Sequence, residues 1–307
     1  MARRKARGRP INGWLVLDKP SGITSTGALT AAKRLIDPAK AGHGGTLDPL
    51  ATGVLPLAFG EATKTVPYIM DGTKSYRFSL RFGEARDTDD AEGVALKTSA
   101  HRPDDAGIED ALQDYRGVVA QVPPFYAAVK VAGERAYDLA RRGEVFQLEA
   151  REVRIDRLVM IDRPDADRAV FEMDCGKGTY VRALARDLGE QLGCFAHVET
   201  LRRTRVGPFR IEDAVGLDVL ERLVADDALL QVLAPVSTAL ADIPALAVTE
   251  PQALRLRSGQ RIRVAPGLLV GSSEEGNTTV RAMLADRTVA LGRLEGADLD
   301  PVRVFND

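Results

Sequence analysis

The sequence predicts an α+β protein with a mixed, largely antiparallel sheet flanked by helices, followed by a small C-terminal β-barrel. Strand and helix patterns do not alternate strictly in the first part of the chain, which favours a mixed sheet over repeated parallel βαβ units. Several short strand patterns follow one another closely in the last part, as in small barrels. A chain of 307 residues is long enough for about two domains.

The first predicted elements are a strand at Asn12–Asp18 and a helix at Thr26–Ile36. The strand is a short apolar run that ends in a Pro/Gly/Ser turn, and the helix carries apolar residues three and four positions apart. Residues Tyr76 to Phe82 alternate between apolar and polar side chains, the period-2 pattern of a strand with one buried face. Further strands are predicted at Val153–Ile161 and Ala169–Cys175, and further helices at Gly107–Tyr115, Glu134–Arg142 and Val181–Leu192.

The pattern changes near the C-terminal end. Prolines between Asp242 and Pro251 interrupt it, so we predict a domain boundary near Leu240. The strand-like runs beyond it are Arg261–Val264, Leu268–Val270, Val280–Leu284 and Val289–Leu294. The expected organisation is a basic flexible tail at residues 1–10, a first domain at 11–240 and a second domain at 241–307.

Composition excludes several classes of protein. Hydrophobic residues make up 45% and charged residues 28% of the chain, as in ordinary globular proteins. No apolar run approaches the roughly 20 residues of a membrane helix, and no signal core is present, so we expect no membrane association and a cytoplasmic location. Two cysteines, Cys175 and Cys194, cannot form a disulfide framework, and with three histidines the chain is poorly supplied for a metal site.

Basic residues gather locally although the net charge is −2. Phosphate binding needs a local basic face rather than a basic protein, so such clusters predict contacts with the phosphates of a nucleic acid. The N-terminal cluster contains Arg3, Arg4, Lys5, Arg7 and Arg9, and a solvated, disordered tail is the alternative for it. The second cluster contains Arg202, Arg203 and Arg205, close to Arg210.

Asp48 is the strongest candidate for a catalytic residue. It lies in the segment that reads GHGGTLDPLATGVLPLAFGEATK from Gly42 to Lys64, between a glycine-rich turn and an apolar run. Glycines allow close approach, so a planar base could lie against this loop. The alternative is that Asp48 caps a helix whose first residue is Pro49. The segment lacks the GxxxxGK[ST] spacing of a nucleotide-binding loop.

Three further residues have both a functional and a structural interpretation. Arg182 can keep a buried nucleophilic carboxylate ionised, or it can form an ordinary surface ion pair. Tyr76 lies on the buried face of its strand, where it can stack on a flipped base or belong to the core. His43 can occupy the space that a flipped base vacates, or it can be a simple loop residue.

Five segments together resemble the TruB family of tRNA pseudouridine synthases. Besides the Asp48 segment they read NGWLVLDKPSGITS, VPPFYAAVKVAGERAYDLARRGE, GKGTYVRALARDLGE and HVETLRRTRVGPF, and they span most of Asn12–Phe209. The resemblance implies the pseudouridine synthase fold, an RNA-gripping insertion at about residues 122–150 and a C-terminal PUA-like RNA-binding domain. It assigns the site residues as follows: Asp48 the nucleophile, Tyr76 the stacking partner of the uracil, His43 the support of the refolded RNA loop, Arg182 the partner of the nucleophile, Tyr180 and Leu201 the pocket lining, and Lys19 and Lys64 secondary supports.

The resemblance implies that the protein converts uridine 55 in the T-arm of tRNA to pseudouridine by base flipping. We expect no cofactor, no metal, no obligatory protein partner and a monomer. Two alternatives remain: a catalytic subunit directed by a guide RNA, and a tRNA-folding chaperone without catalysis. The chain departs from the family pattern at Arg86, where a threonine is usual, and at Ala127, where a serine is usual. Whether Asp48 adds to the sugar, adds to the ring or assists elimination stays open.

Overall fold

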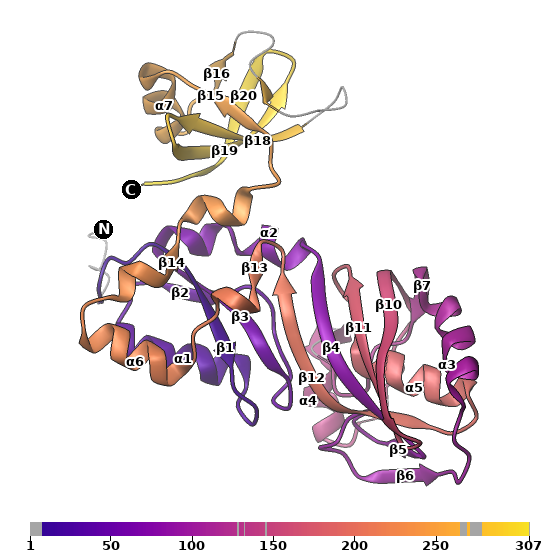
Figure 1. Ribbon diagram of the computed structural model, residues 1–307. Helices are drawn as coiled ribbons and strands as arrows, with labels where there is room; N and C mark the ends of the chain where they lie inside the picture. Colours follow the sequence, from indigo (N-terminus) through magenta and orange to yellow (C-terminus); the bar gives the residue numbers. More distant parts are fainter. Residues whose placement is uncertain are drawn as a thin grey trace.

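The computed structural model describes residues 8–127, 129–131, 133–144, 146–264, 269–270 and 278–306. The N-terminal basic cluster up to Arg7 and part of the predicted strand at Leu268–Val270 lie outside these residues. Within the described parts of the chain, two separate sheets carry most of the strands (Figure 1).

The first sheet is mixed, as predicted, and contains ten of the described strands. Its strands, in spatial order, are β14 (Leu233–Ala234), β1 (Gly13–Lys19), β3 (Thr52–Phe59), β12 (Ala196–Val206), β4 (Lys74–Phe82), β11 (Arg168–Cys175), β10 (Arg151–Asp165) and β7 (Gly117–Gln121), with β2 (Ala41–His43) on β3 and β13 (Phe209–Arg210) on β12. Only the pairing of β3 with β12 is parallel among these described strands. The sheet is therefore largely antiparallel.

Helices cover the two halves of this sheet differently. Around β1 and β3 both faces are covered, which explains why these strands are apolar almost throughout. One face packs against α1 (Ser25–Ile36), α3 (Asp105–Ala111), α5 (Val181–Gln191) and α6 (Leu217–Ala225). The other packs against α2 (Val66–Asp71) and the 3₁₀ helices η1 (Gly60–Lys64) and η5 (Val236–Leu240).

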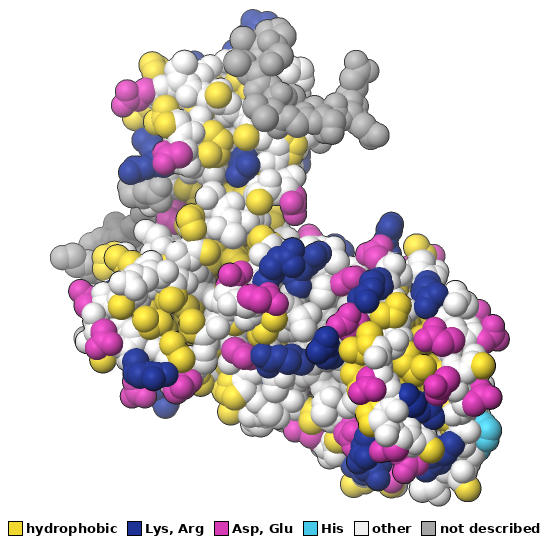
Figure 2. Space-filling model, viewed as in Figure 1, with side chains coloured by type: hydrophobic (Ala, Val, Ile, Leu, Met, Phe, Trp, Pro, Cys, Tyr) yellow, Lys and Arg dark blue, Asp and Glu magenta, His cyan; other side chains and the backbone are white. Residues whose placement is uncertain are grey.

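The half of the sheet formed by β4, β10 and β11 is covered on one face only. Phe78, Leu80 and Phe82 of β4 point into the core, and Arg77 and Arg81 between them point to solvent. We call the solvent side of these strands and of β12 the open face; its charged residues include Arg77, Arg81, Arg168, Glu172 and Glu199. Basic and acidic side chains are interspersed over it (Figure 2). The alternation predicted for Tyr76–Phe82 is confirmed.

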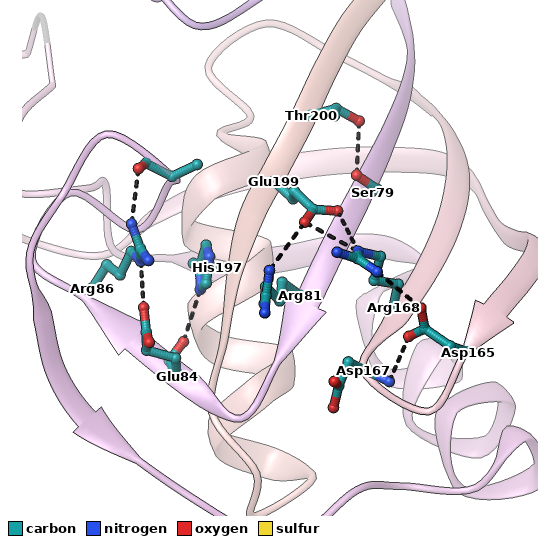
Figure 3. Close-up of polar contacts among 11 residues, drawn as sticks. Ser79, Arg81, Glu84, Arg86, Asp165, Asp167, Arg168, His197, Glu199 and Thr200 are labelled. Atoms are coloured by element: carbon teal, nitrogen blue, oxygen red, sulfur yellow. Dashed lines mark hydrogen bonds and ion pairs between the residues drawn. The ribbon is translucent and has the colours of Figure 1, made fainter.

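Ion pairs between neighbouring strands connect the open face (Figure 3). Glu199 of β12 contacts Arg168 of β11, with Nε–Oε2 at 3.0 Å, and Arg81 of β4, with Nη1–Oε1 at 3.5 Å. Ser79 and Thr200 share a hydrogen bond of 2.7 Å between their hydroxyl groups. Such cross-strand pairs stabilise the face of the sheet that no apolar layer covers, although each exposed pair adds little to the free energy of unfolding.

The second sheet follows residue 244 and has its own apolar core. Its described strands, in spatial order, are β16 (Ile262–Arg263), β20 (Asp298–Val304), β19 (Arg287–Glu295), β18 (Thr278–Leu284), β15 (Ala245–Ala247) and β17 (Leu269–Val270), with α7 (Glu250–Arg257) packed against them. This curled sheet agrees with the PUA-like barrel expected from the sequence. Leu240, Leu291 and Phe305 form a small apolar cluster between the two sheets.

The remaining elements are short and surround these sheets. They are the hairpins β5 (Glu84–Arg86) with β6 (Ala95–Thr98) and β8 (Lys130–Val131) with β9 (Glu134–Arg135), the helix α4 (Ala136–Arg141), and the 3₁₀ helices η2 (Leu112–Tyr115), η3 (Ile211–Asp213) and η4 (Leu229–Val232). The predicted helix at Glu134–Arg142 is therefore shorter and begins after a strand. No helix of the described residues is long and apolar enough to span a membrane.

Candidate active site

A cavity of about 280 Å³ opens where four segments of the first sheet and its loops converge. Its walls come from the loop Gly45–Asp48, the beginning of β4, the turn 176–182 before and into α5, and β12. This volume is near the lower limit of roughly 300 Å³ for pockets that hold small ligands, so it suits a single base. Five of the predicted site residues line it: Asp48, Tyr76, Tyr180, Arg182 and Leu201.

Asp48 does not cap a helix. The residues after it form a bend and then enter β3 at Thr52, so the capping alternative is wrong. The loop is instead anchored through its backbone: Ser25 Oγ accepts from the N–H of Leu47 at 2.7 Å and donates to its carbonyl at 3.0 Å. The carboxylate, 36% exposed, is thus held at the cavity wall without being removed from solvent.

Arg182 is the direct charge partner of Asp48. Its Nε lies 2.9 Å from Asp48 Oδ2, and its side chain is only 6% exposed. The N–H does not point at the oxygen well enough for a hydrogen bond, so the contact is an ion pair. Nη1 and Nη2 donate to the carbonyls of Thr88 and Tyr126, both at 3.1 Å, and Asp90 Oδ2 lies 3.7 Å from Nε. The surface-pair alternative for Arg182 is therefore wrong.

The two cavity tyrosines are held in different ways. Burial raises the pKa of Tyr76, so its phenol stays protonated at neutral pH. Burial and then the nearby Asp48 carboxylate raise the pKa of Tyr180. Both backbone groups of Tyr180 bind the side chain of Gln121: its N–H donates to Oε1 at 2.8 Å, and its carbonyl accepts from Nε2 at 3.1 Å. Gln121 thereby fixes the turn that leads into α5.

The other predicted site residues lie outside the cavity lining. His43 is in β2, just before the Asp48 loop, and burial followed by the charge of Arg203 lowers its pKa. Lys19 is fully buried and donates to the carbonyls of Pro20, Ile23 and Pro49, so it holds loops together. Burial lowers its pKa to about 8.

Lys64 lies at the contact between the two sheets rather than at the cavity. Its Nζ pairs with Glu61 Oε2 at 2.6 Å and donates to the carbonyl of Val304 at 2.8 Å. Glu61 also accepts from the N–H of Asn306 at 2.8 Å. Both partners of its ammonium group belong to this contact, and its role as a secondary support of the site stays a prediction.

The predicted basic cluster on β12 splits between the two sides of the sheet. Arg202 pairs with Asp18 on the solvent side, with Nη2–Oδ2 at 2.7 Å and a side chain 41% exposed. Arg203 is 2% exposed and lines the cavity. The prediction that Arg203 meets RNA phosphates is wrong, because its guanidinium group is enclosed by protein. Strand alternation from Leu201, which lies in the cavity, could have revealed this.

Lys74 is a third basic residue of the cavity lining, after Arg182 and Arg203, and sequence patterns did not single it out. It begins β4, and its ammonium group donates to the carbonyls of Met70 and Gly72. Burial, followed by the charge of Arg203, lowers its pKa to about 8. Two residues before Tyr76 on the same strand, it shares the face of Tyr76, which is the signal that could have found it.

The two departures from the family pattern have structural roles. Arg86 binds Glu84 within the β5–β6 hairpin and donates to the carbonyl of Ala91 at 2.8 Å (Figure 3). Ala127 is buried, and its carbonyl accepts from the N–H of Tyr137 at 3.1 Å. Both cysteines are buried and free, and no group of three or more potential metal ligands occurs among the described residues.

Comparison with known proteins places these features in a wider context. Residues 33–181 match the N-terminal domain of the TruB family of pseudouridylate synthases, and residues 182–241 match the C-terminal domain of tRNA pseudouridylate synthase B. A protein of Gluconacetobacter diazotrophicus named tRNA pseudouridine synthase B is 54% identical over 98% of this chain and 100% of its own length. A protein of the same name from Ruegeria sp. is 50% identical over 99% of each chain.

Solved structures show the same fold. A crystal structure of a Cbf5–Nop10–Gar1 complex contains a chain 25% identical to this one, with a TM-score of 0.74 over 96% of this chain and 85% of that chain. An H/ACA RNP bound to a substrate RNA containing 2′-deoxyuridine contains a chain 23% identical, with a TM-score of 0.75 over 100% of this chain and 92% of that chain.

Proposed function

This chain belongs to the TruB family of pseudouridylate synthases, and we propose that it isomerises uridine 55 in the T-arm of tRNA to pseudouridine with Asp48 as the nucleophile. The observation that carries the proposal is the Asp48–Arg182 ion pair of 2.9 Å at the wall of a base-sized cavity. A carboxylate that must act as a nucleophile has to stay ionised in a site partly closed to water, and an arginine partner favours its charged form.

The reaction conserves the composition of the RNA. The N1–C1′ glycosidic bond breaks, the uracil turns, a C5–C1′ bond forms, and the proton from C5 is lost while N1 gains one. No electrons are transferred to an outside acceptor, so the isomerisation needs no redox cofactor and no external energy source. Asp48 would assist the breaking of the glycosidic bond, by addition or by promoting elimination.

The cavity residues would hold the uracil while it turns. A base must leave the RNA stack before Asp48 can reach it, so the uridine would be flipped into the cavity. Tyr76 would stack on the base with its ring, since aromatic faces bind bases of any sequence. Tyr180 and Leu201 would fill the rest of the cavity and exclude water. His43, beside the loop, would support the refolded RNA.

Transfer RNA is the proposed substrate because the relatives named tRNA pseudouridine synthase B match the chain along its whole length at 50–54% identity. Likeness to the chain of the Cbf5–Nop10–Gar1 complex is weaker, at 25% identity. We therefore propose that the protein acts alone, as a monomer, in the cytoplasm. The proposed domains are a catalytic domain at 11–240 with an RNA-gripping insertion at about 122–150, and an RNA-binding domain at 241–307.

A tritium-release assay tests this proposal. Because the hydrogen on C5 is lost when C5 bonds to C1′, a tRNA transcript labelled with tritium at C5 of uridine should release one equivalent of tritium to water. The protein is treated with chelator and given no nucleotide, and a transcript with cytidine at position 55 is the matched control. Release only after a guide RNA is added would assign the chain to the guided class, and binding without any release would assign it to the chaperones.

A further inference from the structure

Arg203 is a deeply buried charged side chain that the mechanism above leaves unused. Its guanidinium group donates to three backbone carbonyls: Nε to Val54 at 2.8 Å, Nη2 to Gly45 at 3.1 Å and Nη1 to Thr46 at 3.3 Å. It is also the cross-strand neighbour of Tyr76, whose phenol group lies close to the charge of Arg203. One side chain thus connects both ends of the loop that carries Asp48 and lies next to the aromatic ring of the cavity.

Strand register explains how Arg203 reaches these groups. Arg203 is the cross-strand partner of Tyr76 on β4, and Leu201 is the partner of Phe78, so their side chains share the inner face of the sheet. On its other side β12 meets β3 at Gly53, which has φ +96°, and a Cβ there would come within 2.2 Å of the Arg203 carbonyl oxygen. Glycine permits this close approach, which brings the guanidinium group beneath the Asp48 loop.

The burial of Arg203 is costly for stability alone. Loss of hydration lowers the pKa of Arg203, which means that burial opposes its charged form. Replacing buried charges by apolar side chains of similar volume often leaves stability unchanged or raises it. The planar guanidinium group, however, offers five N–H donors in a fixed fork, which an apolar side chain cannot imitate. The geometry of these donors is therefore the property that the site uses.

We propose that Arg203 is a positioning residue for the isomerisation: it fixes the main chain of the Asp48 loop relative to Tyr76 on the neighbouring strand. This inference rests on the proposed function. The role differs from that of Arg182, which contacts the Asp48 carboxylate directly. Arg203 instead holds the backbone of the loop through its guanidinium N–H groups, so the distance between the Asp48 carboxylate and a base stacked on Tyr76 depends on these hydrogen bonds.

Single-turnover kinetics with enzyme in excess separate this role from a general folding defect. A misfolded fraction lowers the effective enzyme concentration and so raises the half-saturating concentration, whereas mispositioning lowers the limiting rate at saturation. We expect Arg203→Lys, which keeps charge and bulk but loses the fork, to lower the limiting rate of tritium release at least about tenfold with half-saturation changed less than about threefold. Arg203→Met should lower the limiting rate more than Arg203→Lys does.

The matched control is Arg77→Met, the same chemical change beside Tyr76 on β4 but on the open face, where Arg77 pairs with Glu172 at 2.7 Å. Its limiting rate should equal that of the wild type. A wild-type limiting rate in Arg203→Lys would overturn the inference. An equal loss of limiting rate in Arg77→Met would overturn it too, because the effect would then not depend on the contacts between Arg203 and the Asp48 loop.

Hydrogen exchange gives a second measurement that does not depend on activity. Backbone amides in the segment 44–51 should exchange faster in Arg203→Lys than in the wild type, with the strands β10 and β11 unchanged. Unchanged exchange in 44–51 would overturn the proposal that Arg203 fixes this loop, even if the rate of tritium release fell. If the wild type released no tritium, the proposed function would fail, but this exchange measurement would still decide whether Arg203 fixes the loop.

Discussion

The open face of the first sheet and the cavity on its inner face share strands β4 and β12, yet they use arginine in opposite ways. On the open face Arg81 and Arg168 share the carboxylate of Glu199, and water reaches all three side chains (Figure 3). In the cavity Arg182 and Arg203 are almost fully buried and donate mainly to backbone carbonyls. Solvent screens the first group and leaves the second group unscreened.

This difference separates a role in stability from a role in geometry. An exposed ion pair contributes at most about 1 kcal/mol and can rearrange without consequence. A buried guanidinium group loses its hydration, so each of its donors must find a fixed acceptor, and those acceptors are fixed in return. The cavity arginines therefore determine where loops lie, whereas the open-face arginines mainly give the exposed side of the sheet a polar surface. Four measurements test this contrast.

The largest effect is expected for Asp48→Asn. The variant keeps the size of the side chain but removes the anionic nucleophile, so tritium release should fall by at least about 10³-fold. Thermal stability and tRNA affinity should change little, because the Asp48 side chain is 36% exposed. The measurement combines single-turnover release, a thermal melt and a tRNA titration. Release at the wild-type rate would rule out Asp48 as the nucleophile.

Arg182→Met should lower the limiting rate by about 100-fold, because it leaves Asp48 and the buried Asp90 without their shared cation. The melting temperature should also fall, since the carbonyls of Thr88 and Tyr126 lose their donors. Arg182→Lys serves as the control. Its limiting rate should lie between those of Arg182→Met and the wild type, because lysine restores the positive charge but not the planar set of N–H donors. Equal rates for Met and wild type would show that the ion pair has no catalytic role.

Asp89 gives a pH test of burial near the cavity. Burial raises the pKa of Asp89 from 3.8 to about 6; the charges of Arg186 and Arg182 oppose this change, and those of Asp187 and Asp90 add to it. Between these values the folded state binds more protons than the unfolded state, so the free energy of unfolding falls as pH rises from about 4 to about 6. Below pH 3.8 Asp89 is protonated in both the folded and the unfolded state, so it adds no further pH dependence.

Asp89→Asn cannot titrate, and asparagine tolerates the φ of +60° at this position. The wild type should therefore lose roughly 1–3 kcal/mol relative to the variant between pH 4 and pH 7, measured by denaturant unfolding at each pH. A difference that is constant with pH, or that grows in favour of the wild type as pH rises, would show that Asp89 is not held in its neutral form by burial.

The smallest effect is expected for Glu199→Gln on the open face. It removes the charge that Arg81 and Arg168 share but keeps an oxygen acceptor. The free energy of unfolding should change by less than about 1 kcal/mol, with a smaller change at high salt, and the rate of tritium release should stay constant. A change of about 3 kcal/mol would mean that the open-face pairs behave like buried ones and would break the contrast.

The sequence predicted the two faces of β4 because alternation is a local property. Phe78, Leu80 and Phe82 point inward and Arg77 and Arg81 outward, as the pattern indicates. Five cavity residues were predicted through family resemblance, and the structure brings them together. Strands β1 and β3 are apolar almost throughout because both of their faces are covered. Without alternation, periodicity could not show which side chains point to which face.

Directions of charged side chains were harder to predict. Arg202 and Arg203 look equivalent in the sequence, but strand register places Arg202 at Asp18 and Arg203 beneath the Asp48 loop. Register depends on pairing with β3 and β4, which are more than 100 residues away. The position of Lys64 depends on residues 304–306 in the same way. Alternation shows that Arg203 shares a face with Leu201, but only these long-range pairings show which groups each basic side chain contacts.

The contact of Glu61 and Lys64 with residues 304–306 makes the second sheet a doubly tethered body. One tether is the covalent link after η5, and the other is formed where the end of β20 returns to η1. A domain held by a covalent link alone can rotate about that link, whereas this second contact and the apolar cluster of Leu240, Leu291 and Phe305 restrict such rotation. Because η1 directly follows β3, and β3 begins just after the Asp48 loop, a pull on the second sheet would be transmitted to the strand that supports the nucleophile.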